Sequence, residues 1–153
     1  MCSSDLRLLT EALDRWEAAG VDTSALPGID VRIADLGGLT LGQAGNGVIV
    51  LDDNAAGWGW FLDRTPRNDS EFTRRGNQGE KNRMDLLTVL THEVGHLLGY
   101  DHEPGGLMRE TLDAGTRITV GPAAAGPSAS PTLVSWSPDS PWAGDGLVGR
   151  KRQ

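Results

Sequence analysis

The stretch that decides the fold is HEVGHLLGYDH, residues 92–102. On a helix, residues four apart share one face, so His92 and His96 can direct both imidazoles at one ion. Gly99 can end this helix in a conformation that is costly for other residues, and the chain can then return His102 to the same ion. Three neutral imidazoles with one open position predict a catalytic zinc site, because structural zinc sites close all four positions.

Glu93 is predicted to be the catalytic residue of this site. It projects about 100° away from His92 around a helix, so it can approach a metal-bound water without being a ligand. A solvated helix face is the usual alternative for two histidines four apart. Here all three histidines of the chain fall in the pattern, together with the glutamate and the glycine that the chemistry needs. No histidine remains for a second metal site.

The regions around this motif predict a chain of mixed α and β structure. Apolar residues at steps of three and four indicate a helix over about 5–19, and Leu86 to Leu98 indicate a second helix over 85–98. Short strands are expected over 29–33, 48–51 and 58–62, with brief pairing at 39–41 and a hairpin turn at 45–47. Residues 63–82 are polar, contain many turn-forming residues and are expected to form a surface loop.

The composition changes after about Val120. Residues 121–131 contain only Gly, Pro, Ala and Ser, which is typical of a flexible linker. A further strand is conceivable at 133–136, and the chain ends with basic residues. We therefore expect a globular domain over 1–119 and a linker or tail over 120–153.

Charge and cysteine content exclude several classes of protein. The 14 basic and 21 acidic residues give a formal charge of −7, which argues against nucleic acid as the main partner. The single cysteine, Cys2, excludes an internal disulfide framework and a thiolate metal cluster. No stretch is apolar enough to span a membrane, and the first residues do not resemble a signal peptide. The chain is thus either cytosolic or a segment of a longer exported protein.

The motif resembles the metzincin metallopeptidases, whose signature HExxHxxGxxH is followed by a methionine-containing turn. Met108, in GGLM at 105–108, is the candidate for that methionine, although simple packing is the commoner role of a lone methionine. The LLGYDH sequence and the short path to Met108 look most like matrixins, and the first half looks like bacterial matrixin-like domains. The resemblance implies a minimal α+β zincin: N-terminal helix, small twisted mixed sheet, active-site helix and short C-terminal subdomain.

The chain departs from the matrixin pattern at several positions. Glu103 stands where matrixins usually have serine, and Arg109-Glu110-Thr111 replace the proline and tyrosine that follow the methionine. The family's primed-side pocket therefore cannot be carried over. Residues 55–61 and 84–117 also resemble part of large multidomain bacterial surface proteins, which implies an extracellular or cell-surface location and either a monomer or a module of a longer chain.

The expected activity is that of a zinc-dependent metalloendopeptidase. One zinc-bound water would attack the peptide bond of a polypeptide substrate, and Glu93 would take the proton of the water and pass it to the leaving amine. In the family, an extended substrate pairs with a strand at the edge of the sheet, here expected near 48–51 or 58–61. A non-catalytic, zinc-stabilised binding or adhesion module of a larger surface protein is the alternative, and another type of zinc hydrolase is a third.

Two further features allow more than one interpretation. Calcium is a second candidate ion, with oxygen ligands from Asp52, Asp53, Asn54, Asp63, Asp69 and Glu71, although turn formation also explains these residues. Trp58, Trp60 and Phe61 could line a substrate cleft, but core packing is the simpler role for three neighbouring aromatic residues.

Overall fold

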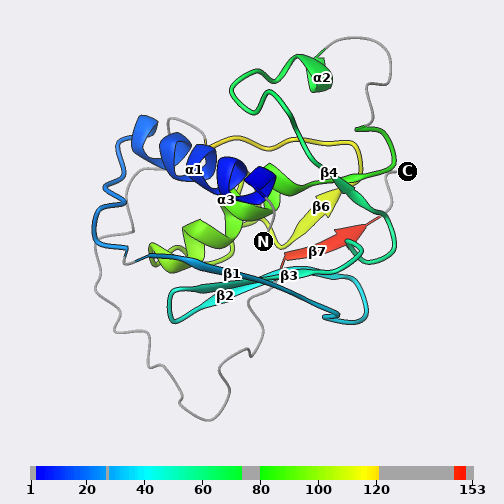
Figure 1. The fold of residues 1–153 in the computed structure, drawn as a ribbon, viewed down its shortest axis with the longest axis horizontal. Coiled ribbons are helices and arrows are strands. Elements are labelled where there is room, and N and C mark those ends of the chain that lie inside the picture. The colour runs from blue at the N-terminus through cyan, green and yellow to red at the C-terminus, as the bar shows by residue number, and fades with distance from the viewer. Residues whose placement is uncertain (1–2, 27, 74–79, 121–146, 151–153) are drawn as a thin grey trace.

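The computed structural model describes residues 3–26, 28–73, 80–120 and 147–150. Helix α1, Ser3–Ala18, and helix α3, Leu86–Leu97, lie side by side on one face of a five-stranded sheet (Figure 1). The predicted helices at 5–19 and 85–98 are thereby confirmed. None of the helices in the described ranges is long and apolar enough to cross a membrane.

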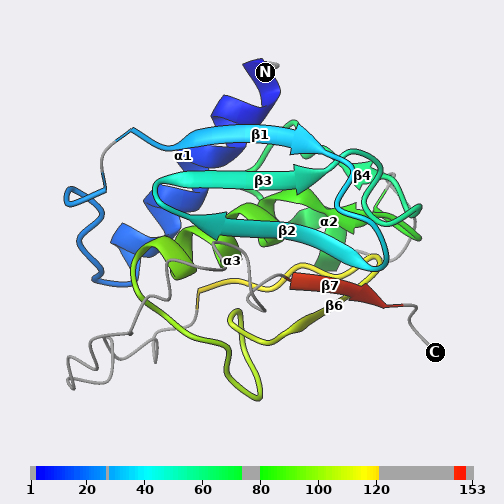
Figure 2. The ribbon, with the colours of Figure 1, turned by 90° about the horizontal axis from the view of Figure 1, so that it is seen from below.

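The sheet is mixed, and its strands do not follow chain order. They are β1 (Asp30–Ala34), β2 (Thr40–Gly45), β3 (Val48–Asp52), β6 (Thr111–Asp113) and β7 (Leu147–Arg150), arranged β1-β3-β2-β7-β6. Strands β1 and β3 are parallel, whereas β2 is antiparallel to β3 and β7. Figure 2 shows this order from below, with both helices behind the sheet.

The β2–β3 hairpin has the predicted turn at 45–47. Asn46 and Gly47 both have positive φ, at 54° and 74°, which is the backbone that a two-residue hairpin turn requires. The register pairs Gly45 with Val48 and Gly42 with Leu51. The hairpin therefore sets which residues of β2 face the helix above it.

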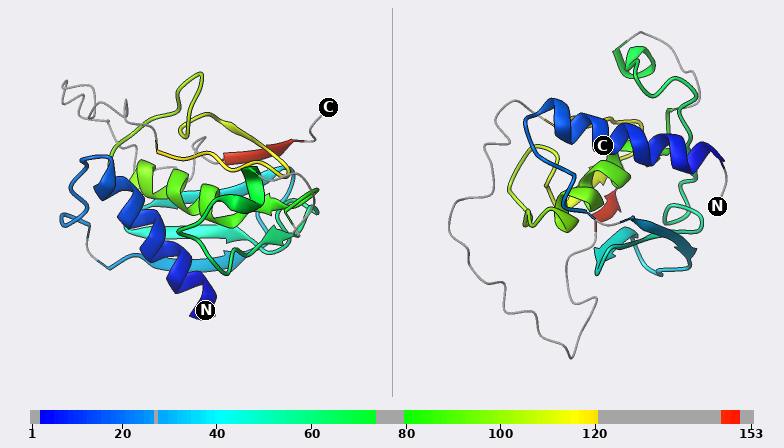
Figure 3. Two further views of the ribbon diagram at one scale, coloured as in Figure 1. Left: turned by 90° about the horizontal axis from the view of Figure 1, so that it is seen from above. Right: turned by 60° about the vertical axis from the view of Figure 1, so that its left-hand side comes forward.

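The hydrophobic core lies between the helices and the sheet. Figure 3 shows α1 and α3 crossing above the strands, and Trp16, Leu41, Ile49, Leu51 and Leu90 are buried between these layers. The Trp16 Nε1–H donates a hydrogen bond of 2.8 Å to the Thr91 carbonyl oxygen, which ties α1 to α3. A buried indole needs such a partner, so this bond helps to fix the helix pair.

Several sequence-based expectations need correction. Residues 48–51 cannot be the substrate-pairing edge, because β3 is flanked by β1 and β2. The strand expected at 58–62 is reduced to β4, Trp60–Phe61, which pairs with β5, Met84–Asp85, in a separate two-stranded sheet. The loop at 63–82 contains a short helix, α2, at Ser70–Thr73.

The C-terminal part of the chain differs from expectation at one place. Residues 147–150 lie in the segment expected to be linker or tail, yet they form β7 inside the sheet. Composition could not show this, because the strand is short and pairs with residues about 100 positions earlier. The expected strand at 133–136 lies outside the described residues, and the boundary at 119 stays a prediction.

Candidate metal centre

The three histidines meet at their Nε2 atoms. The separations are 3.0 Å between His92 and His96, 3.2 Å between His96 and His102, and 3.3 Å between His92 and His102. A tetrahedral zinc ion with Zn–N bonds of about 2.0–2.1 Å requires nitrogen atoms about 3.3 Å apart. The triangle of nitrogen atoms thus has nearly the dimensions that this ion needs, and these three residues form a potential metal-binding group.

The other ring nitrogens hold the imidazoles in the protonation state that a metal needs. His92 Nδ1 lies 2.8 Å from the Leu107 carbonyl oxygen, and His96 Nδ1 lies 2.8 Å from the Tyr100 carbonyl oxygen. A carbonyl oxygen only accepts hydrogen bonds, so each Nδ1 carries the proton and donates. Each Nε2 therefore presents its lone pair to the centre of the triangle.

Burial also keeps His92 neutral. Desolvation lowers the pKa of His92 to about 3, the hydrogen bond to Leu107 opposes this shift, and the charges of His96 and His102 add to it. At neutral pH the ring is therefore neutral, with its one proton on Nδ1, and able to ligate a cation through Nε2. The donor set, its spacing and its protonation state all fit zinc.

The turn after α3 brings His102 back to the helix. Gly99 has φ of +96°, in the left-handed region, and the Tyr100 N–H donates to the Gly95 carbonyl oxygen at 3.0 Å. Glycine at this position is the usual way to end a helix with such a bond. The predicted role of Gly99 as the residue that ends the helix agrees with this backbone.

The Glu93 side chain points from α3 toward strand β2. A Cβ atom added at Gly42 would lie 2.9 Å from Glu93 Oε1 and 3.1 Å from Val89 Cγ1. Any larger residue at position 42 would therefore displace the carboxylate. Glu93 has no exposed surface, so its position is set by this close approach of helix and strand. Sequence reasoning missed Gly42, because a lone glycine in a strand gives no specific signal.

Met108 is buried directly beneath the metal-binding helix. A Cβ atom at Gly95 would lie 2.6 Å from Met108 Sδ and 2.8 Å from Trp16 Cζ2. Gly95 is thus the position at which α3 rests on the methionine and on the indole. Met108 follows Leu107 in the turn after the histidine motif and packs against α3 at Gly95, and its role as the floor of the histidine cluster stays a prediction.

A buried arginine anchors the start of α3. Asp85 caps the helix by accepting from the Thr88 N–H at 3.1 Å, and Arg117 holds the Asp85 carboxylate with two bonds of 2.8 Å. The same guanidinium reaches Asp63 at 2.7 Å and Asp69 at 2.8 Å. Burial disfavours the charge of Arg117, but these carboxylates outweigh it and raise its pKa. The sequence gives no signal for this network, because its members are far apart in the chain.

Most of the remaining acidic and aromatic candidates have structural partners, whereas Asp53 forms a potential cation-binding group with Asp35 and Asp52. Asp63 and Asp69 bind Arg117, and Asp52 accepts backbone N–H groups from Leu36 at 2.9 Å and Ala56 at 2.7 Å. Calcium binding therefore stays a prediction. The aromatic residues expected in the core are there: Phe61 is buried, and Trp58 and Trp60 pack against the core cluster.

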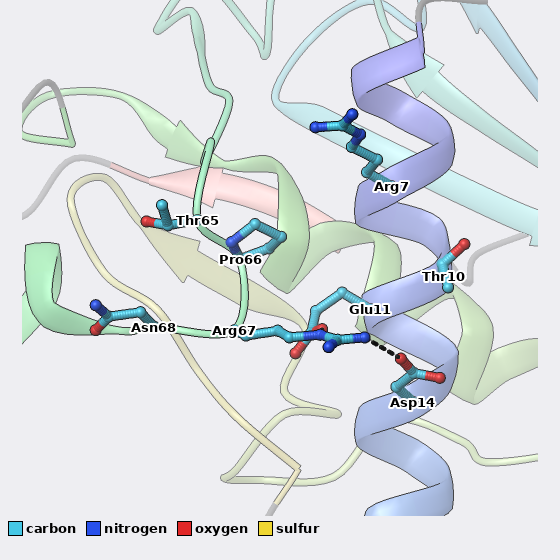
Figure 4. A pocket seen from close by; sticks show the side chains of 8 residues that line it. All are labelled: Arg7, Thr10, Glu11, Asp14, Thr65, Pro66, Arg67 and Asn68. Carbon is cyan, nitrogen blue, oxygen red and sulfur yellow. Dashed lines mark ion pairs between the residues drawn. The ribbon is translucent and has the colours of Figure 1, made fainter.

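A separate pocket of about 480 Å³ lies between α1 and the loop before α2, and Figure 4 shows its lining. Arg67 reaches across it to Asp14 at 3.7 Å and to Glu11 at 3.5 Å, and its side chain is mostly exposed. None of the three histidines lines this pocket. It is therefore distinct from the metal centre.

The comparisons with known proteins agree with this geometry. The matrixin family model matches residues 36–121, which is more than half of the chain and contains the three histidines, Glu93 and Met108. Searches of curated proteins and of solved structures gave no match. The family match favours a peptidase over a non-catalytic zinc module. The chain belongs to the matrixins, a family of metzincin zinc metalloendopeptidases.

Proposed function

We propose that His92, His96 and His102 hold one catalytic zinc ion and that Glu93 is the general base of peptide hydrolysis. The observation that carries this proposal is the convergence of three Nε2 atoms within 3.3 Å of one another. A bound zinc ion would supply Lewis-acid chemistry, activating water near neutral pH and polarising the scissile carbonyl. Met108 and the Leu107 carbonyl would keep the ligands in place.

Glu93 has the properties of a base rather than of a ligand. Its carboxylate emerges one position after His92 and is directed toward Gly42 in β2, and it is not part of the potential metal-binding group that the three histidines form. There it would take the proton of the attacking water and pass it to the leaving amine as the peptide bond breaks. We assign to strand β2 the pairing with an extended polypeptide substrate, on the side where β7 now lies, since Gly42 brings the backbone of β2 to Glu93.

The location that we propose is extracellular or at a cell surface, as matrixins are typically secreted proteins. The partner is a polypeptide, and the chain would act as a monomer or as a module of a longer protein. These assignments are supported by the family match over 36–121.

Digestion of casein with and without a chelator tests the activity. We expect hydrolysis to stop when the metal is removed and to return when stoichiometric zinc is added back. A protein that binds one zinc ion but never cleaves casein, even when a substitution in strand β7 weakens its pairing with β2, would instead support a non-catalytic zinc module. Zinc content must be measured on the same samples, so that loss of metal and loss of function are separated.

A further inference from the structure

Strand β7 lies between strands β2 and β6, each of which adjoins a part of the metal centre, and we call this position the slot. On one side it is antiparallel to β2, where Thr40 pairs with Val148 and Gly42 pairs with Leu147, with a bulge at the intervening residue. On the other side it is parallel to β6, which begins three residues after Met108. Figure 2 shows β7 beside β2, at the side of the sheet where β6 also lies.

The backbone of β7 is bonded to both neighbours. The Val148 N–H donates to the Glu110 carbonyl oxygen at 3.0 Å, and the Gly149 N–H donates to the Leu39 carbonyl oxygen at 2.7 Å. Successive residues of β7 thus donate to neighbours on opposite sides, and main-chain bonds of this kind are what hold an extended peptide that joins a sheet as a strand. A polypeptide from solution could use the same donors and acceptors only if β7 were absent.

Gly42 connects this slot to the proposed base. It is the register partner of Leu147, and a Cβ atom added at Gly42 would lie 2.9 Å from Glu93 Oε1. Leu147 is 1% exposed and Glu93 is 0% exposed. With β7 in place, the strand that we assign to substrate pairing is therefore occupied at the very residue that adjoins the base.

We propose that residues 147–150 are an autoinhibitory strand, which occupies the substrate slot between β2 and β6 and must leave before a polypeptide can bind. This inference rests on the proposed function of the metal centre and adds the regulation of that site. The occupant comes from the same chain, so its local concentration is high and inhibition does not require a second molecule.

A disulfide that holds β7 against β2 and that can be reduced tests the proposal in the full chain. Because Gly149 and Leu39 form a hydrogen-bonded pair, Thr40 and Val148 form the adjacent non-hydrogen-bonded pair, with Cα atoms about 4.5 Å apart. That spacing lies within the range that a disulfide spans. The variant carries Thr40→Cys and Val148→Cys, with Cys2→Ser to remove the native thiol. It is assayed oxidised, and again after reduction by a phosphine that does not compete for zinc.

The oxidised form is expected to cleave casein at least tenfold more slowly than the same sample after reduction. A fluorescent peptide with the sequence of 147–150 should bind the reduced form and fail to bind the oxidised form. Equal hydrolysis and equal peptide binding in the two states would overturn the proposal. If neither state cleaves casein but only the reduced state binds the peptide, the proposed function fails while the occupied slot is upheld.

A second variant weakens β7 without any cross-link. Val148→Pro removes the N–H that donates to Glu110, whereas Val148→Ala keeps it and is the matched control. We expect Val148→Pro to raise the rate of casein cleavage severalfold over Val148→Ala at equal zinc content. A rate equal to or below that of Val148→Ala, in a protein that keeps its circular dichroism spectrum, would contradict autoinhibition. If Val148→Pro does not fold, the comparison of the oxidised and reduced forms of the cysteine variant tests the proposal by itself.

Discussion

The Leu107 carbonyl oxygen lies 2.8 Å from His92 Nδ1, although the two residues are 15 positions apart. Through this bond, the position of the His92 ring depends on the turn that follows His102, the last histidine of the motif. The bond fixes the ring orientation and the tautomer of His92, and loss of such a partner typically lowers metal affinity by about 10- to 100-fold. The metal centre is thus a property of the helix and of the 103–108 turn together.

Replacing Gly106 should weaken zinc binding. Gly106 has φ of +70° and directly precedes Leu107, so an alanine there would cost about 1–2 kcal/mol in the left-handed region and shift the Leu107 carbonyl. We expect Gly106→Ala to lower zinc affinity by about tenfold, measured by competition with a chromogenic chelator. Gly105→Ala is the matched control, since open space surrounds that position too and its φ is not positive. Equal affinities in the two variants would count against the role of the turn.

Replacing Gly95 should destabilise the protein although alanine favours helices. The new Cβ would meet Met108 Sδ at 2.6 Å and Trp16 Cζ2 at 2.8 Å, and such overpacking costs about 1–3 kcal/mol. Urea unfolding of Gly95→Ala measures this loss. Combining it with Met108→Ala removes the sulfur clash, so the double variant should lose less than the sum of the two single losses. Simple additivity would show that the methionine does not crowd this position.

Removing the Arg117 charge should be far more damaging than removing an exposed one. The Arg117 side chain is 2% exposed and binds Asp63, Asp69 and Asp85, so Arg117→Met leaves buried carboxylates without their cation. A loss of about 3–5 kcal/mol in the free energy of unfolding is expected. Arg32→Met, which removes an exposed pair with Asp30, should change it by less than about 1 kcal/mol. Similar losses in both variants would mean that the buried network contributes little.

Asp69 should make stability depend on pH in the acid range. Partial burial favours its neutral form, but the bonds from Arg15 and Arg117 together outweigh this and lower its pKa below 3.8. A depressed folded-state pKa stabilises the fold above the unfolded pKa, and this stabilisation is lost as the pH falls through the folded value. Asp69→Asn should therefore lose less unfolding free energy between pH 5 and pH 3 than the unsubstituted chain. An equal loss in both proteins would show that Asp69 is not linked to folding.

The metal centre could be predicted from the sequence because its spacing is local. His92, Glu93 and His96 lie within one helical turn, and Gly99 sets where the chain turns back to bring His102 to the cluster. The same is true of α1 and α3, whose apolar residues recur with the helical period. The match of the family model over 36–121 gives this interpretation independent support.

What could not be predicted depends on contacts between distant residues. In the sequence, Gly42 is an ordinary strand glycine and Arg117 is an ordinary cation. In the structure, Glu93 on α3 packs against Gly42, and three aspartates surround Arg117. The order of the strands is also non-local, which is why the sequence left the substrate edge open between 48–51 and 58–61 and could not show that β3 is interior. Strand β7 has four residues in a region of biased composition, so no period identifies it.

The most direct test of the account is Glu93→Gln, measured by zinc content and casein cleavage in the unsubstituted chain and in the Val148→Pro background. The amide keeps the volume of the carboxylate beside Gly42 but cannot accept the proton. We predict one zinc ion per chain and a fall in cleavage rate of about 10²- to 10⁴-fold. Full cleavage activity in a Glu93→Gln protein that retains its zinc would contradict the assignment of Glu93 as the base.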